Sequence, residues 1–282
     1  MDVKQTPDWL DRFPWPGAET HKHSRGRLGV VSGGPWATGA ARLASRAGQR
    51  IGAGWVEVWA PEAAAPVLAP VLEAALLRPF GDAAELAEPA ERLDAMVIGP
   101  ALGRRPEHLA MVETVLAGAA ALVLDADALS LFSQWPEALF DRLSPNDVLT
   151  PHLGEFDRLF PDLMGGGHRA DLARRAAERA GCVVVLKGNQ TVIASPDGRV
   201  EVSAPAPAWL ATAGTGDVLA GMIGGLLAQK MDAFDAARAA VWIHAQAAGR
   251  FGPGLIAEDL PDLIPPVLGG LWQAAQRKGE GA

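Results

Sequence analysis

Short apolar runs recur along the chain and are separated by longer segments in which apolar residues have helical spacing. The runs are rich in Val, Leu, Ile and Ala, which predicts buried strands. They lie at residues 28–31, 55–59, 95–98, 121–124, 148–150 and 183–186. Strands that are covered on both faces read as continuous apolar runs, as in a parallel sheet. We therefore expect a mostly parallel sheet.

The segments between these strands predict helices at residues 39–51, 106–119, 155–160 and 169–180. Alternating strands and helices are typical of an α/β fold, here a doubly wound sheet with helices on both faces. After Lys187 the order changes to a hairpin, with strands at 191–194 and 199–202 across Pro196-Asp197-Gly198. A glycine-rich turn and further helices complete the chain.

No Ser/Gly-rich or charged linker divides the 282 residues. We expect an N-terminal extension over residues 1–20 and a single domain over residues 21–282. Apolar residues make up 49% of the chain and charged residues 21%, which is ordinary for a globular protein with a sizeable core. The net charge of -8 argues against a nucleic-acid partner, because phosphate backbones are bound mainly by an excess of Lys and Arg.

The cysteine content and the N-terminus bear on the cellular compartment. Cys182 is the only cysteine, so an internal disulfide is impossible and a buried, inert thiol is expected. The chain start lacks the basic-then-apolar pattern of a secretory signal, and no apolar run approaches the ~20 residues of a membrane span. We therefore expect a cytoplasmic protein without a membrane partner.

The turn and helix at residues 212–227 carry the clearest chemical signal. Gly214 and Gly216 can adopt backbone angles closed to other residues, so the amides of Gly214, Thr215 and Gly216 can form an anion hole at the helix start. Asp217 would accept a proton from a hydroxyl held against a bound phosphoryl group. The alternative is a plain capping Asp after a glycine-rich turn. The helix face comprises Val218, Leu219, Met222, Ile223, Leu226 and Leu227.

Polar or glycine-rich segments follow the predicted strands directly. They are Ser32-Gly33-Gly34, Gly99-Pro100, Asp125-Ala126-Asp127, Thr150-Pro151-His152 and Lys187-Gly188. Ligands of open parallel sheets bind outside the carboxyl ends of the strands. Turn chemistry explains Gly and Pro at these positions, but it does not by itself explain Asp, His and Lys. We expect these segments to converge on one crevice.

Two of these segments leave alternatives open. Asp125 and Asp127 could orient magnesium-bound waters, but one of them is better explained as a cap of the helix that follows. The segment from Lys187 to Thr191 could hold the phosphate or ribose of a nucleotide, or it could be a solvent-exposed hairpin rim.

The histidines and the basic segment have different expected roles. We favour a ligand contact for His152, because Pro151 and Gly154 fix it at the crevice, and core packing for His244 on an apolar helix. The basic entry segment is best explained as a solvated approach to the first strand, although it could attract an anionic substrate. It comprises His21, Lys22, His23, Arg25 and Arg27.

With these motifs in view, the chain resembles the ribokinase-like superfamily and, within it, the NAD(P)H-hydrate dehydratases, also described as the YjeF-type carbohydrate kinase domain. The resemblance runs from His21 to about Pro265. It rests on Gly33-Gly34 with Gly39-Ala40, Gly99-Pro100-Ala101-Leu102-Gly103, Asp125-Ala126-Asp127-Ala128-Leu129, Thr150-Pro151-His152-Leu153-Gly154-Glu155-Phe156, Leu186-Lys187-Gly188 and residues 211–221. Sugar kinases of the superfamily share the glycine turn and its Asp, whereas the Thr-Pro-His and Gly-Gly motifs resemble the dehydratases.

The resemblance implies a ribokinase-like three-layer fold and repair of the hydrated cofactors NADHX and NADPHX, with ADP or ATP as co-substrate and Mg2+ as cofactor. Asp217 would be the catalytic base. It implies that the hydrated cofactor contacts Ala40, Gly103, His152 and Asp217, and that the adenine nucleotide contacts Lys187, Gly188, Asn189, Gln190, Thr191 and Gly216. A homo-oligomer is also expected.

The chain departs from the family pattern in three ways. Ala101 replaces a usual Gly, and residues 206–209 read Ala-Pro-Ala-Trp where relatives often have Gly-Asn-Pro-Gly. The residues before His21 are too few for the epimerase module of many relatives, so only the dehydratase activity is expected, with a separate epimerase as partner. The alternatives are a kinase for a hydroxymethylpyrimidine or a sugar, and a non-catalytic nucleotide sensor.

Overall fold

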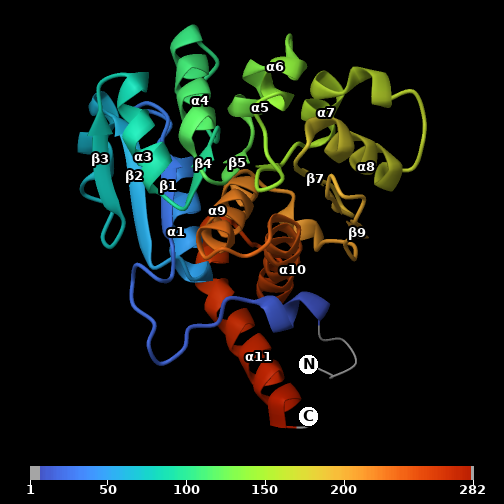
Figure 1. The fold of residues 1–282 in the computed structure, drawn as a ribbon. Coiled ribbons are helices and arrows are strands. Elements are labelled where there is room, and N and C mark those ends of the chain that lie inside the picture. The colour runs from blue at the N-terminus through green and yellow to red at the C-terminus, as the bar shows by residue number, and fades with distance from the viewer. Residues whose placement is uncertain (1–6, 281–282) are drawn as a thin grey trace.

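A nine-stranded sheet forms the centre of the molecule, which we describe from a computed structural model covering residues 7–280 (Figure 1). The part of the expected extension in residues 1–6 lies outside the described residues. The strands are β1 (Arg27–Val31), β2 (Trp55–Pro61), β3 (Leu76–Phe80), β4 (Ala95–Ile98), β5 (Leu122–Leu124), β6 (Val148–Leu149), β7 (Val183–Leu186), β8 (Val192–Ala194) and β9 (Val200–Val202). Their order is β3-β2-β1-β4-β5-β6-β7-β8-β9.

The strand pairing confirms the predicted architecture. All pairs from β3 to β7 are parallel, and β7–β8 and β8–β9 are antiparallel. The change of direction occurs at the predicted hairpin. The parallel part of the sheet therefore has its carboxyl strand ends along one edge, as expected.

Helices cover both faces of the sheet, as predicted for a doubly wound fold (Figure 1). One face carries α1 (Gly39–Ile51), α9 (Thr215–Ala228), α10 (Ala233–Phe251) and α11 (Leu260–Glu280). The other carries α3 (Ala87–Arg92), α4 (Pro106–Gly118), α5 (Asp127–Leu131), α6 (Pro136–Phe140), α7 (Leu153–Leu159) and α8 (Arg169–Ala180). The short α2 (Ala65–Leu68) precedes β3.

The two faces bury separate apolar cores. In β4, Val97 points into the core beneath α1 and α9, whereas Met96 and Ile98 point into the core beneath α4. This alternation follows from the two-residue period of a strand. Cys182 lies in the second core, where burial raises the pKa of its thiol well above the ordinary value. The expected burial of the cysteine is thus confirmed.

Helices α1 and α9 pack closely because small residues line their contact. A Cβ added to Gly221 would lie 2.1 Å from the carbonyl oxygen of Ala44, and one added to Gly225 would lie 2.9 Å from that of Gly48. Larger side chains could not fit at either position. This close packing fixes the start of α9 relative to the first turn of α1.

The edge strand β3 was not predicted. Its residues Leu76–Phe80 include Arg78 and Pro79, both exposed, so it lacks a continuous apolar run. Proline is tolerated in an edge strand, where its missing N–H costs no ladder hydrogen bond. Helix α7 also begins earlier than predicted, at Leu153.

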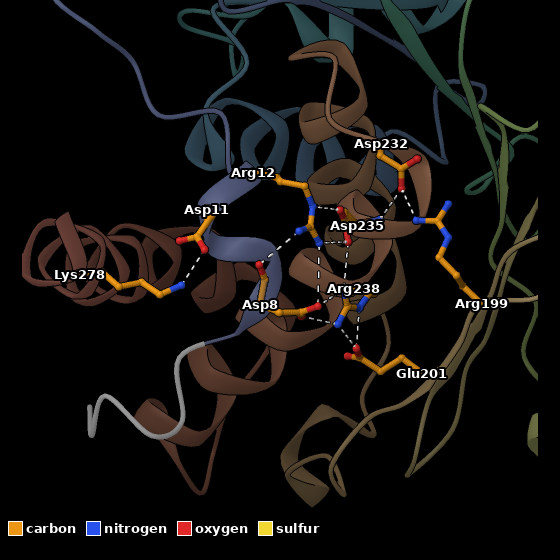
Figure 2. Close-up of polar contacts among 9 residues, drawn as sticks. All are labelled: Asp8, Asp11, Arg12, Arg199, Glu201, Asp232, Asp235, Arg238 and Lys278. Carbon is orange, nitrogen blue, oxygen red and sulfur yellow. Dashed lines mark hydrogen bonds and ion pairs between the residues drawn. The ribbon is translucent and has the colours of Figure 1, made fainter. Parts of the chain in front are cut away.

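The N-terminal segment Asp8–Arg12 is fixed to α10 by apolar packing, which includes Trp9 against Trp242, and by an ion-pair network that Figure 2 shows. Trp9 and Leu10 are buried in the core between the helices. Arg238 of α10, with a side chain only 12% exposed, pairs with Asp8, Glu201 and Asp235. The segment, the β9 hairpin and α10 therefore share one charge network. No helix among residues 7–280 is long and apolar enough to cross a membrane.

Candidate active site

The loops after β1, β4, β5, β6 and β7 meet at one edge of the sheet, as predicted. A Cβ on Gly33 would lie 2.0 Å from the carbonyl oxygen of Ala101, and one on Gly99 would lie 1.9 Å from that of Asp125. His152 forms an isolated parallel bridge with Lys187. These contacts bring the predicted motifs together at one edge of the sheet.

The glycine turn ends at the start of α9 in a geometry that suits an anion. Gly214 is the N-cap residue with a φ of +89°, a left-handed conformation that favours glycine. The hydroxyl of Thr215 donates to the carbonyl oxygens of Leu210 and Thr212, which fixes the turn. The first N–H groups of an α-helix lack intrahelical acceptors and attract negative charge. The turn is therefore compatible with the predicted anion hole.

Asp217 lies in the first turn of α9 and is not its cap. The N-cap position belongs to Gly214, and no side chain caps the helix there. The alternative of a plain capping Asp was therefore wrong. Burial raises the pKa of Asp217 to about 6, the charge of Asp125 acts in the same direction, and the charge of Lys187 opposes both. A carboxylate with this pKa is suited to act as a general base near neutral pH.

Asp125 and Asp127 each have a cationic partner. Asp125, which is 2% exposed, accepts from the Nζ of Lys187 at 2.6 Å. Asp127 accepts from the amide of Gly103 at 3.0 Å and from the Nε of Arg104 at 2.6 Å. The expectation that one of them caps the next helix was wrong, because the N-cap of α5 is Ala126, and no side chain caps the helix there.

His152 is the N-cap of α7. Its Nδ1 accepts from the amides of Gly154 and Glu155, and the Glu155 carboxylate accepts from the His152 amide. This reciprocal cap explains why α7 begins at Leu153. The side chain is 57% exposed at this edge of the sheet. A structural role thus accompanies the ligand contact predicted for His152.

The other residues predicted to contact the substrate lie at the same edge of the sheet. Ala40 is buried in the first turn of α1. Gly103 has a φ of +99° and lies against the His108 ring. Ala101, the unusual residue of this motif, has a φ of +53°. The usual Gly is therefore replaced at a position where the backbone is left-handed.

The predicted nucleotide segment is mostly an exposed turn between β7 and β8. Gly188, Asn189 and Gln190 are exposed, whereas Thr191 is buried and its amide donates to the Ser203 hydroxyl. Sequence reasoning missed Arg169, the first residue of α8, which donates to the carbonyl oxygens of Leu186 and Lys187. Its only sequence signal was a positive charge at a helix start.

The last candidates from the sequence are His244 and the basic entry segment. His244 is buried in α10, as predicted, and burial lowers the pKa of its ring to about 4. In the basic entry segment, Lys22 lies over the Trp55 ring at 4.7 Å and Arg27 pairs with Asp94 at 3.3 Å. Lys22 is exposed, as predicted for a solvated approach to the first strand, whereas Arg27 is the first residue of β1.

No group of three or more His, Cys, Asp or Glu side chains within residues 7–280 could hold a metal ion by itself. Mg2+ commonly binds through few protein carboxylates together with substrate phosphates. A magnesium ion bound in this way does not need such a group of protein ligands.

The fold is that of the ribokinase-like superfamily. A ribokinase-like superfamily protein from Enterococcus faecalis has a TM-score of 0.83 at 24% identity and covers 96% of this chain and 95% of its own. The family model described as NAD(P)H-hydrate dehydratase matches residues 28–264. The chain belongs to this NAD(P)H-hydrate dehydratase family.

Two similar proteins support the family assignment. The ADP/ATP-dependent NAD(P)H-hydrate dehydratase from Bacillus subtilis, co-crystallised with ATP and Mg2+, has 31% identity and a TM-score of 0.78 over 95% of this chain and 99% of its own. The bifunctional NAD(P)H-hydrate repair enzyme Nnr of Salinibacter ruber is 39% identical over 99% of this chain and 54% of its own length. The chain spans about half the length of the curated relatives it matches.

Proposed function

We propose that this protein dehydrates NADHX and NADPHX to NADH and NADPH, with ADP or ATP as phosphoryl donor. The observation that carries the proposal is the half-buried carboxylate of Asp217, one residue after Gly216 in the first turn of α9. An acid of raised pKa beside free helix amides combines a base for a hydroxyl with a site for phosphoryl oxygens.

In the proposed reaction, Asp217 accepts the proton of the C6 hydroxyl on the hydrated nicotinamide ring. The hydroxyl oxygen bonds to the terminal phosphorus while the bond from that phosphorus to its bridging oxygen breaks, which releases AMP from ADP or ADP from ATP. The ring-nitrogen lone pair then expels phosphate, and loss of a C5 proton restores the C5–C6 double bond. Phosphorylation helps because phosphate leaves readily and hydroxide does not.

The amides of Gly214, Thr215 and Gly216 are proposed to stabilise charge on the transferred phosphoryl group. Magnesium bound with the nucleotide would neutralise further negative charge on the phosphates. Ala40, Gly103 and His152 are proposed to contact the hydrated cofactor. Residues Lys187, Gly188, Asn189, Gln190 and Thr191, together with Gly216, are proposed to contact the nucleotide.

The decisive assay mixes the purified protein with NADHX or NADPHX, Mg2+ and either ADP or ATP. We expect the absorbance of reduced nicotinamide to return and inorganic phosphate to be released in equal amount. Parallel assays with the two nucleotides and the two hydrates measure the preference for ADP or ATP and the preference for NADHX or NADPHX. A stable phosphoester of another alcohol, without recovery of that absorbance, would instead identify a small-molecule kinase.

The proposal extends to assembly and partners. The matched curated relatives are named bifunctional repair enzymes, so we propose that an NAD(P)H-hydrate epimerase supplies the reactive epimer to this site. We further propose a cytoplasmic homo-oligomer. Light scattering on the purified protein measures the assembly size, and adding epimerase to the assay should raise the yield from a mixture of epimers.

A further inference from the structure

Asp125 and Lys187 form an ion pair across the end of β6. Asp125 follows β5 and Lys187 follows β7, and β6 lies between these strands in the sheet. The distance from the Nζ of Lys187 to the Oδ1 of Asp125 is 2.6 Å, and the Asp125 side chain is 2% exposed and that of Lys187 21%. A buried carboxylate requires a partner of opposite charge, and Lys187 provides it.

The pair lies directly against the first turn of α9. A Cβ added to Gly216 would be 3.6 Å from the Nζ of Lys187 and 3.8 Å from the Oδ2 of Asp125. These are van der Waals distances, so nothing separates the pair from the helix start. The ammonium group therefore lies beside the amides that make up the predicted anion hole.

The surroundings of Asp217 are otherwise poor in charge. Leu43 of α1 packs against Gly214, and the strands beneath α9 are apolar. His244 of α10 interacts with the backbone of Thr215, but burial lowers the pKa of this histidine to about 4, so it is neutral at pH 7. Asp125 and Lys187 are the two charges that shift the pKa of Asp217, in opposite directions.

We propose that Asp125 is a positioning residue that holds the Lys187 ammonium against the start of α9, ready to bind the terminal phosphoryl group of the nucleotide. This inference rests on the function proposed above. An ammonium group has three N–H donors. One goes to Asp125, which leaves two for phosphoryl oxygens. Asp125 itself is too deeply buried to touch the substrate, so it acts through Lys187 and through its charge on Asp217.

The test compares Asp125→Asn, Lys187→Met and the double variant in two measurements. Calorimetry with ADP and Mg2+ measures nucleotide affinity. Each single variant should weaken binding about ten- to a hundredfold, as for loss of a charge-assisted hydrogen bond. In the Lys187→Met background, Asp125→Asn should cause no further loss, because its effect on the nucleotide passes through Lys187.

The second measurement is the pH dependence of kcat/KM with the hydrated cofactor. Asp125→Asn removes a negative charge near Asp217, so the acidic limb should move down by about one pH unit. A merely structural role would not move this limb. Asp127→Asn is the matched control, since its carboxylate pairs with Arg104 at the same edge, and it should leave the limb in place.

If Asp125→Asn alone does not fold, the comparison of Lys187→Met with the double variant still decides. The double variant has no unpaired buried ion, and in Lys187→Met the buried carboxyl can be neutralised by taking up a proton. Equal ADP affinity in these two proteins supports the proposal, and a further loss in the double variant overturns it. The proposal is also overturned if Asp125→Asn folds and the acidic limb of its kcat/KM profile stays where it is in the unaltered protein. Absence of hydrate turnover alongside the expected calorimetric pattern would refute the proposed function and leave the positioning role intact.

Discussion

Arg12 donates from Nε to the Oδ2 of Asp235 at 2.5 Å, joining the N-terminal segment to α10 across 223 positions of sequence. The Asp235 side chain is 4% exposed, and Arg238 approaches its other oxygen at 2.9 Å (Figure 2). Two cations thus neutralise one buried carboxylate. The network fixes the segment that places Trp9 in the core.

Replacing Arg238 should destabilise the protein substantially. Arg238→Met keeps much of the side-chain volume over Phe234 but leaves Asp235 with one cation and Asp8 and Glu201 without their shared partner. We expect a loss of about 3 kcal/mol in the free energy of unfolding, measured by urea denaturation. The matched control, Lys278→Met, removes an exposed pair with Asp11 and should cost less than about 1 kcal/mol. Equal losses in the two variants would contradict the role assigned to Arg238.

Restoring glycine at position 101 should stabilise the protein. Ala101 is exposed and has a φ of +53°, so Ala101→Gly relieves strain and removes little packing. We expect a gain of about 0.5–1 kcal/mol after the greater unfolded-state entropy of glycine is counted. Gly103→Ala should do the reverse, because its Cβ would lie 2.4 Å from the Cε1 of His108 at a φ of +99°. Denaturation midpoints measure both, and a lower midpoint for Ala101→Gly would refute the strain.

Asp217→Asn should abolish most turnover without preventing nucleotide binding. Amide nitrogen cannot accept the hydroxyl proton, so kcat should fall about a thousandfold or more. Affinity for ADP with Mg2+ should stay within a few-fold of that of the unaltered protein. The control Asp141→Asn changes an exposed residue at the end of α6 and should leave kcat unchanged. Near-normal turnover in Asp217→Asn would remove Asp217 from the mechanism.

Asp217→Asn should also make the folded protein more stable, and this gain should depend on pH. The pKa of Asp217 is raised from 3.8 to about 6 in the folded protein. The folded state therefore binds the proton more tightly, and stability falls as pH rises from about 4 to about 6. Asn carries no charge and so avoids the cost of burying an ionised carboxylate. Asp217→Asn should therefore be more stable above pH 6, by up to about 3 kcal/mol, since each pKa unit corresponds to about 1.36 kcal/mol. Thermal unfolding at pH 4 and pH 8 measures the difference, which should be absent at pH 4.

The amino-acid sequence by itself determined the elements with strong local patterns. Helix α1 occupies residues 39–51 as predicted, and β4 and β7 match their predicted ranges. The φ of Gly214 was also foreseeable, because a glycine before an apolar helix face suggests a left-handed turn. These features depend on residues within a few positions of one another, so local periodicity is enough to reveal them.

Only the tertiary structure decided which distant side chains meet. The partner of Asp125 is Lys187, 62 positions away, because the sheet order brings β5, β6 and β7 together. His152 caps α7 and also lies beside Lys187, because the backbone that follows β6 runs next to the end of β7. Such contacts depend on strand order and packing, which bring together groups whose charges and burial no local pattern records.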